Sequence, residues 1–263
     1  MKKSFEIDIK ISVIDKIIES GYLDDSGVLL NEYSLDNNSR RVDLAVLSRD
    51  KFYGFEIKSD ADSLKRLHGQ SIKYLEFFDK LIVVVTSKHL KKSLEILPDN
   101  VEVWEFRNNK IIVSRRGRTI KIKNKISFLR LMSMKDLKRF ARQENLRADA
   151  DKRHEIEQHL IRSPLNKIRR KSFLSIFNKY EKATSEFIAT AHLLGLQKNN
   201  IKALGLRFKE RQIEKIEEEE KQFIWGKMKR QTDRDKAMEV MAENYGGNAF
   251  GDIPDTIKKI LDD

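Results

Sequence analysis

The chain of 263 residues contains no cysteine, only three prolines and no apolar run long enough to cross a membrane. Without cysteine it forms neither disulfides nor cysteine-ligated zinc sites, and this composition is typical of the cytoplasm. No signal-peptide pattern opens the chain, so we expect a cytoplasmic protein without membrane contact. The low proline content and the 40% share of hydrophobic residues predict a folded, helix-rich protein.

Several common catalytic sites are missing as well. The sequence has no glycine-rich phosphate-binding loop, which argues against an NTPase, and no Gly-x-Ser-x-Gly turn for a serine nucleophile. His154 and His159 flank a glutamate, as in zinc proteases, but they are five residues apart. On a helix this spacing separates the two rings by about 140°, so they do not form an i,i+4 metal-binding pair.

Positive charge is unevenly distributed along the chain. The whole chain has a net charge of +12, but the segment from Arg115 to Glu210 carries 25 Lys and Arg against 9 Asp and Glu. That segment has a charge of +16, so the rest of the chain has a charge of −4. A basic block predicts a polyanionic partner, since neutralised phosphates release counterions. A charged surface that serves solubility is the alternative.

Two neighbouring strand-like runs carry the residues best suited to catalysis. The run 41–47 offers Asp43, and the run 52–58 offers Glu56 and Lys58. Residues i and i+2 of a strand share a face, so Glu56 and Lys58 are expected to project together. Converging carboxylates beside a lysine form a site for a hard divalent cation next to a cationic group, the chemistry that phosphodiester hydrolysis requires. A hairpin with a solvated Glu–Lys pair is the alternative.

The surrounding pattern predicts an α/β domain with the element order αβββαβαβ. The run 81–86 is almost entirely apolar, which indicates a strand buried on both faces of a sheet. More strand-like sequence lies between residues 110 and 122. The expected helices cover about 5–20, 61–78 and 88–97, and the expected strands cover about 28–35, 41–47, 52–58, 81–86 and 101–106.

Residues 5–106 resemble the PD-(D/E)XK nuclease superfamily, which has the restriction-endonuclease-like fold with a mixed central sheet. Asp43 matches the acid in the first half of the motif, and Glu56 opens the acid-x-Lys triplet of the second half. Val42 takes the place of the proline in the family's name. Glu32, on the preceding strand, is either a further metal ligand or an ordinary exposed strand glutamate.

A second match lies on the following helix. Gln70 and Tyr74 resemble the Q-x-x-x-Y element of the RecB-like and lambda-exonuclease-like branches, with an ordinary helix surface as the alternative. The resemblance implies Mg²⁺ as the cofactor, for which Mn²⁺ can substitute. It also implies roles for individual residues: Asp43, Glu56 and the carbonyl of Ile57 as metal ligands, and Asp43, Glu56, Lys58 and Gln70 as catalytic residues.

An all-helical domain is expected after the nuclease-like domain of residues 1–125. It covers 126–243, and its segment 134–162 resembles the helix–extended loop–helix SAP motif, with a plain helical hairpin as the alternative. A long charged helix over about 202–242, a linker at 245–251 and a short helix at 253–261 follow, so residues 244–263 form a tail. The expected DNA-binding residues are Lys138, Arg139, Arg142, Lys152, Arg153, Lys167, Arg169, Arg170 and Lys171.

The sequence as a whole therefore predicts a Mg²⁺-dependent deoxyribonuclease that acts on DNA in restriction or defence, in a phage or in DNA repair. Two alternatives stay open. One is a catalytically inactive nucleic-acid-binding protein with a nuclease-like fold. The other is a helical interaction protein, and the helical region leaves open a homodimer or a larger complex.

Overall fold

The computed structural model describes residues 6–24, 26–35, 40–145 and 152–196, together with residues 201, 204 and 235. Residues 1–208 form one compact unit and residues 209–263 form a second. Apart from Leu204 and Asp235, the helix expected over 202–242, the linker at 245–251 and the helix at 253–261 lie outside the described residues. Among the described helices, none has the length and hydropathy that a bilayer crossing requires.

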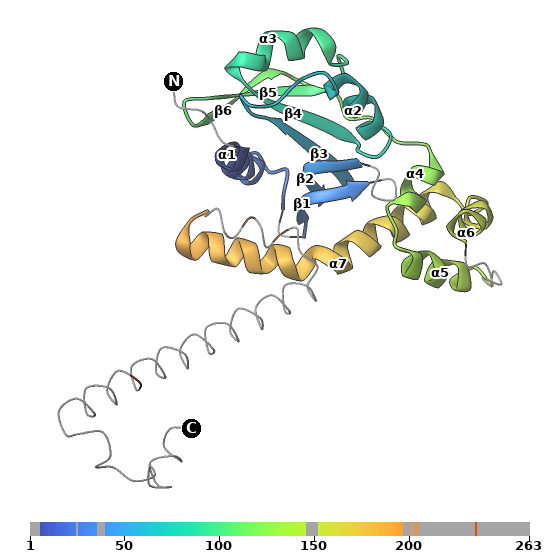
Figure 1. The fold of residues 1–263 in the computed structure, drawn as a ribbon. Coiled ribbons are helices and arrows are strands. Elements are labelled where there is room, and N and C mark those ends of the chain that lie inside the picture. Colours follow the sequence, from blue (N-terminus) through green and yellow to red (C-terminus); the bar gives the residue numbers. More distant parts are fainter. Residues whose placement is uncertain are drawn as a thin grey trace, which may run out of the picture. The chain divides into compact units, whose positions relative to one another are not determined.

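Six strands form a single mixed sheet whose spatial order follows the order of the chain (Figure 1). The second strand is antiparallel to both the first and the third. The third, fourth and fifth strands run parallel, and the sixth is antiparallel to the fifth. The α/β class, the mixed sheet and the element order αβββαβαβ are thus confirmed. The strands are β1 (Val28–Leu35), β2 (Arg40–Ser48), β3 (Lys51–Lys58), β4 (Lys80–Thr86), β5 (Glu102–Arg107) and β6 (Lys110–Arg115).

Seven described helices accompany the sheet. They are α1 (Glu6–Glu19), α2 (Leu67–Tyr74), α3 (Ser87–Ile96), α4 (Lys125–Arg130), α5 (Met134–Gln143), α6 (Arg153–Leu160) and α7 (Leu165–Leu194). The helix expected over 61–78 is shorter than predicted, because a side-chain turn precedes it. The carboxylate of Asp62 accepts hydrogen bonds from the backbone N–H of Ser59 at 2.8 Å and from its hydroxyl at 2.6 Å. Such local bonds compete with helix formation.

Each face of the sheet is covered by its own hydrophobic core. Helix α1 packs on one face, where its isoleucines meet Leu44, Phe55 and Trp104. Helices α2 and α4–α7 contribute to the core on the other face, around Phe52 and Phe78. Strand β4 supplies alternate residues to both cores, so its expected burial on both faces is confirmed.

Helix α7 joins the helical region to the sheet at the edge strand β1. The hydroxyl of Thr184 accepts a hydrogen bond from the N–H of Leu29 at 3.0 Å and donates one to the carbonyl of the same residue at 3.2 Å. The edge of the sheet is therefore capped by a helix side chain rather than left exposed. Residues 126–196 belong to the same compact unit as the sheet. The division of function between 1–125 and 126–243 stays a prediction.

Candidate active site

The candidate catalytic residues meet where strands β2 and β3 part. Paired residues run from Ser48 opposite Lys51 to Leu44 opposite Phe55. Beyond that point the side chain of Asp43 takes the place of the backbone hydrogen bonds between the two strands. Its Oδ2 accepts the N–H of Ile57 at 2.6 Å. A carboxylate thus satisfies a backbone donor that the neighbouring strand no longer reaches.

Glu56 and Lys58 occupy the same face of β3, as the i,i+2 spacing predicts. Lys58 Nζ lies 2.6 Å from Glu56 Oε1, and only 3% of the Glu56 side chain and 12% of the Lys58 side chain are exposed. The charge of Glu56 acts directly on Asp43. The structure therefore brings together the three residues that the sequence singled out, at the point where the inner strands β2 and β3 separate.

Burial is the largest cause that raises the pKa of both carboxylates. Desolvation by burial, and next the neighbouring charge of Glu56, raise the pKa of Asp43 to about 7. The pKa of Glu56 is also raised by burial, although the ammonium of Lys58 opposes that effect. Glu56 Oε2 is buried and has no hydrogen-bond partner among the described residues. The half-buried carboxylate of Asp43 beside the buried carboxylate of Glu56, with its unsatisfied oxygen, fits a divalent cation. A cation there would offset the burial and the repulsion.

Glu32 does not join this pair. Its Oε2 lies 3.0 Å from the guanidinium of Arg41, and 45% of its side chain is exposed. Among the described residues, no three His, Asp or Glu side chains gather into a metal-binding group. Glu32 is therefore an exposed strand glutamate, although its backbone is unusual, with a φ of 52° inside β1. This left-handed conformation is rare for a residue with a side chain.

A buried lysine from α1, which sequence reasoning missed, also acts on the site. Lys10 is 3% exposed, and its Nζ donates to Asn31 Oδ1 at 3.1 Å. Its charge lowers the pKa of Asp43. The sequence did contain a signal, because Lys10 falls on the same helix stripe as the buried residues Ile14 and Ile17, at i+4 and i+7.

The Q-x-x-x-Y residues lie beside the carboxylates. Tyr74 donates its hydroxyl hydrogen to the carbonyl of Arg41 at 2.7 Å. Burial and the charges of Glu56 and Asp43 hold its pKa far above the ordinary value, so its hydroxyl keeps its proton. Gln70, one turn earlier on α2, lowers that pKa. Tyr74 therefore lies beside the carboxylates, and a functional role of the pair stays a prediction.

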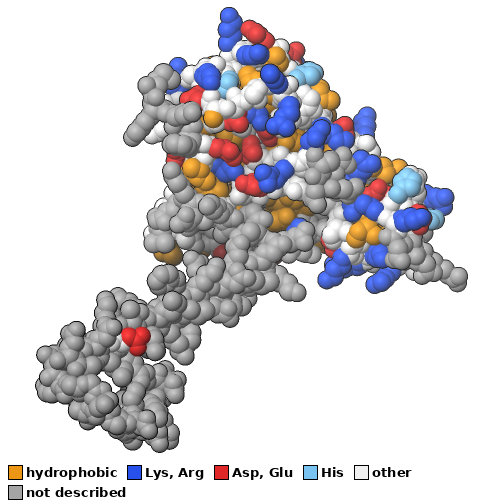
Figure 2. Space-filling view, in the orientation of Figure 1, with side chains coloured by type: hydrophobic (Ala, Val, Ile, Leu, Met, Phe, Trp, Pro, Cys, Tyr) orange, Lys and Arg blue, Asp and Glu red, His pale blue; other side chains and the backbone are white. Residues whose placement is uncertain are grey.

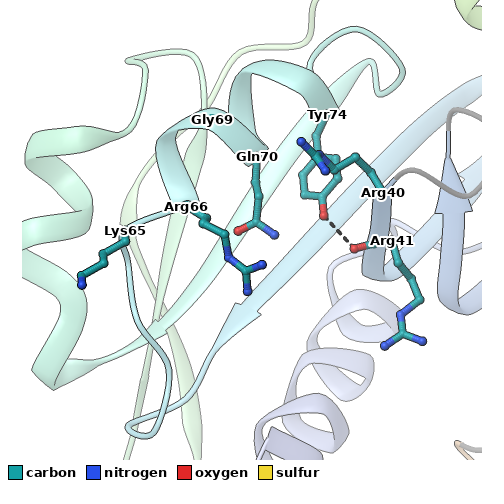
Figure 3. Close-up of a pocket in the computed structure, with 7 residues that line it drawn as sticks. All are labelled: Arg40, Arg41, Lys65, Arg66, Gly69, Gln70 and Tyr74. Carbon is teal, nitrogen blue, oxygen red and sulfur yellow. Dashed lines mark hydrogen bonds between the residues drawn. The ribbon is translucent and has the colours of Figure 1, made fainter.

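Gln70 and Tyr74 also line a cleft of about 410 Å³ between α2 and β2, which we call the basic cleft (Figure 3). Figure 3 shows the side chains of Arg66 and Gln70 pointing from α2 toward the strand that carries Arg40 and Arg41. Tyr74 lies between the two elements. The full lining consists of Arg40, Arg41, Lys65, Arg66, Gly69, Gln70 and Tyr74.

The expected DNA-binding residues divide into two groups. Lys and Arg side chains lie on the surface around α5 and α6 (Figure 2). Seven of the nine are exposed or half-buried there or on α7: Lys138, Arg139, Arg142, Lys152, Lys167, Arg170 and Lys171. The other two, Arg153 and Arg169, are turned inward. Arg153 bonds Glu157 and the carbonyls of Leu129 and Met132, so its guanidinium is used within the helical region.

Arg169 is held by hydrogen bonds and by two aromatic rings. It makes two hydrogen bonds to Asp79, at 3.0 and 2.8 Å, and its guanidinium lies 5.2 Å from the ring centre of Phe128 and 4.7 Å from that of Phe173. Only 18% of its side chain is exposed. Arg169 therefore fastens α7 to the loop before β4. The guanidinium groups of Arg153 and Arg169 are thus committed to contacts within the fold. Their expected contact with DNA stays a prediction.

The SAP-like segment is described only in part. Helices α5 and α6 bury Leu137, Ile156 and Leu160. The connection at residues 146–151 lies outside the described residues. The extended loop of the motif therefore stays a prediction.

The comparison with known proteins places the chain in a phage family. The family model described as bacteriophage P4 protein cII matches residues 1–209. The chain belongs to the phage P4 cII family. Protein cII of Enterobacteria phage P4 is 31% identical to it over 206 residues, which are 76% of each chain.

The solved structures add little to this family assignment. A protein of unknown function from Silicibacter pomeroyi aligns over 57% of this chain and 99% of its own, with 17% identity and a TM-score of 0.37. This likeness carries no functional argument. The region shared with the cII family, in contrast, includes the carboxylates, the basic cleft and helix α7. The sheet and the helices that complete its core therefore belong to one family unit.

Proposed function

We propose that the protein is a metal-dependent nuclease that hydrolyses phosphodiester bonds in DNA, built on a PD-(D/E)XK-type, restriction-endonuclease-like core. The observation that carries this proposal is the convergence of Asp43, Glu56 and Lys58 where β2 and β3 part. The element order and the mixed sheet support the fold assignment. A phage relative is compatible with the expected phage context, and a restriction, defence or repair role is an alternative setting.

Asp43 and Glu56, with the carbonyl of Ile57, are the proposed ligands of Mg²⁺, for which Mn²⁺ can substitute. The fit rests on the raised pKa of both carboxylates and on the buried, unsatisfied Oε2 of Glu56. A bound metal would lower the pKa of a water molecule and offset negative charge on the scissile phosphate.

The chain's own residues supply the remaining chemistry. Lys58, held against Glu56, presents a positive charge that orients the attacking water and stabilises charge on the phosphate as the bond breaks. Tyr74 keeps its proton because its pKa is raised, and it donates that proton to the carbonyl of Arg41, so a neutral hydroxyl lies beside the carboxylates. Gln70 positions the water or a phosphate oxygen from the wall of the basic cleft.

A nucleic-acid-binding protein that does not cleave is the second candidate. The observation that favours it is the contact of 2.6 Å between Lys58 and Glu56, in which the two charges satisfy each other without a metal. The surface arginines and the basic cleft would serve such a protein equally well. Cleavage in the presence of a metal separates the two candidates.

The test is a digestion panel with the full chain. Linear, circular, single-stranded and branched DNA and an RNA control are each incubated with Mg²⁺, Mn²⁺ or EDTA. We expect metal-dependent cleavage of DNA that falls by about 100-fold or more in Glu56→Gln and in Lys58→Met. Asp99→Asn is the matched control, because that carboxylate is fully exposed and far along the chain from the site.

Two results would contradict the proposal. Binding of DNA without cleavage under every metal condition would support the second candidate. Unchanged cleavage in both variants, with folding verified by circular dichroism, would remove the catalytic assignment of Glu56 and Lys58. Calorimetric titration with Mn²⁺ gives an independent reading, in which Asp43→Asn is expected to bind the metal more weakly than the wild type.

A further inference from the structure

The lining of the basic cleft combines positive charge with hydrogen-bond donors. Four of its seven residues are Lys or Arg, and Gln70 adds an amide. Tyr74 contributes its hydroxyl side only, because the residue is 1% exposed and its ring is buried. The cleft thus presents donors and cations but no aromatic face on which a base could stack.

Much of this positive charge is not neutralised by the protein. The side chains of Lys65 and Arg66 are exposed and make no hydrogen bond or ion pair with any residue that the structure describes. Arg41 is paired with Glu32, but both side chains are exposed, at 65% and 45%, so the pair is weak and open to exchange. An anion that enters the cleft would therefore find available partners.

Tyr74 stands between the cleft and the carboxylate pair. This residue lines the cleft, bonds the carbonyl of Arg41 and interacts with Glu56 and Asp43. An anion in the cleft would consequently lie next to the group on which the carboxylates act. Arginine recognises phosphate through paired N–H donors, which makes a phosphate the best-matched anion.

We propose that the basic cleft binds a phosphate of the nucleic-acid backbone next to the scissile phosphodiester, and that it does so without reading the bases. The position relative to the scissile bond rests on the proposed nuclease function, whereas the binding itself does not. The phosphate is either an internal diester or a terminal monoester. Phosphate contacts fix the register of a strand but carry no sequence information.

Gly69 offers a sharp test of this proposal. Gly69 lines the cleft, and a Cβ built on it meets nothing within 4 Å, so a side chain there enters open space at the wall of the cleft. Gly69→Glu and Gly69→Gln have nearly the same shape, and both replace glycine in helix α2 with a better helix former. They differ in charge, so a difference between them reports electrostatics rather than bulk or folding.

Binding is measured by fluorescence anisotropy with the full chain in EDTA, where no cleavage occurs. The probes are short single-stranded oligonucleotides of thymidine or of adenosine, with and without a terminal phosphate. We expect Gly69→Glu to bind about tenfold more weakly than Gly69→Gln. The ratio is expected to be equal for both base compositions, and the salt dependence to be shallower by about one phosphate contact.

Probes with and without a terminal phosphate distinguish an internal phosphodiester from a terminal phosphate monoester as the bound group. If the ratio of the dissociation constants of Gly69→Glu and Gly69→Gln is the same for probes with and without a terminal phosphate, the cleft binds an internal phosphate. If the ratio is larger for probes with a terminal phosphate, the cleft binds the end of the strand. Equal affinity of the two variants for every probe would overturn the proposal. Arg66→Gln is a second variant, because this exposed side chain caps no helix donor and its loss does not disturb α2. Unchanged affinity in Arg66→Gln would count against the cleft as well.

The cleavage panel keeps this inference separate from the proposed function. A charge effect at Gly69 in a protein that never cleaves DNA would retain the phosphate site and remove the nuclease. Cleavage without any charge effect at Gly69 would retain the nuclease and remove the phosphate site.

Discussion

The substitution Asp43→Asn is expected to make the metal-free protein more stable at about pH 8. Asparagine keeps an oxygen that can accept the N–H of Ile57, now bonded at 2.6 Å, but it carries no charge. Burial, and next the charge of Glu56, raise the pKa of Asp43 from 3.8 to about 7. The folded state therefore disfavours the ionised carboxylate, and the amide removes that penalty.

The magnitude follows from the two pKa values. A change from 3.8 to about 7 is worth about 4 kcal/mol at a pH well above both values. Part of this penalty belongs to the repulsion shared with Glu56, so we expect a gain of about 1–3 kcal/mol in the free energy of unfolding. Folded Asp43 binds its proton more tightly than the unfolded chain does, so the contribution of Asp43 to the stability of the wild type falls as the pH rises from about 4 to 7. The advantage of the variant is full above this window and disappears below it.

Urea unfolding followed by circular dichroism, in EDTA, measures this difference at about pH 8, 6 and 4. Asp99→Asn is the control, since its fully exposed carboxylate has no burial penalty to lose. We expect its stability to match the wild type at each pH. If Asp43→Asn is instead less stable than the wild type at pH 8, the negative charge of Asp43 is needed by Lys10 and Lys58. The carboxylate would then be a structural residue.

Two further predictions concern packing within the fold. Gly54→Ala is expected to lower the free energy of unfolding by about 1–3 kcal/mol, because the new Cβ would lie 2.5 Å from Cδ2 of Phe78. Gly69→Ala, where the space is empty, is expected not to destabilise the protein, and equal denaturant midpoints for the two variants would contradict this explanation. Arg169→Met is expected to cost about 3–5 kcal/mol, because it leaves the buried carboxylate of Asp79 without its cation. The exposed neighbour variant Arg170→Met is expected to change stability by less than about 0.5 kcal/mol, and thermal unfolding that ranks the two in the opposite order would refute the structural role of Arg169.

The strands were predictable because their pattern is local. The expected ranges 28–35 and 81–86 agree with β1 and β4 to within one residue at either end. The alternation of buried and exposed positions and the all-apolar run determine them without reference to the rest of the chain. Helix α2 was overextended because the carboxylate of Asp62 bonds Ser59, and a helix pattern does not reveal such a turn.

The site was predictable to the extent that it lies on one strand. The i,i+2 rule places Glu56 with Lys58, and the preceding strand supplies Asp43. The contribution of Lys10 depends on α1 lying against the point where β2 and β3 part, which is a tertiary fact. The same limit applies to Arg169, whose charge predicts a DNA contact but does not reveal its contacts with Asp79 within the fold.

The contacts of α7 also determine how a DNA-binding role of the helical region can be tested. Phe173 lies 6.1 Å, ring centre to ring centre, from Phe52 of β3, and Tyr180 lies 6.0 Å from Tyr33 of β1. A fragment that ends at residue 125 would expose this part of the core. If such a fragment bound DNA weakly, the result would not distinguish a lost DNA contact from a damaged fold. Neutralising exposed arginines of the full chain avoids the ambiguity. Arg139, Arg142 and Arg170 are suitable, because their side chains lie on the surface of the unit that the cII family shares.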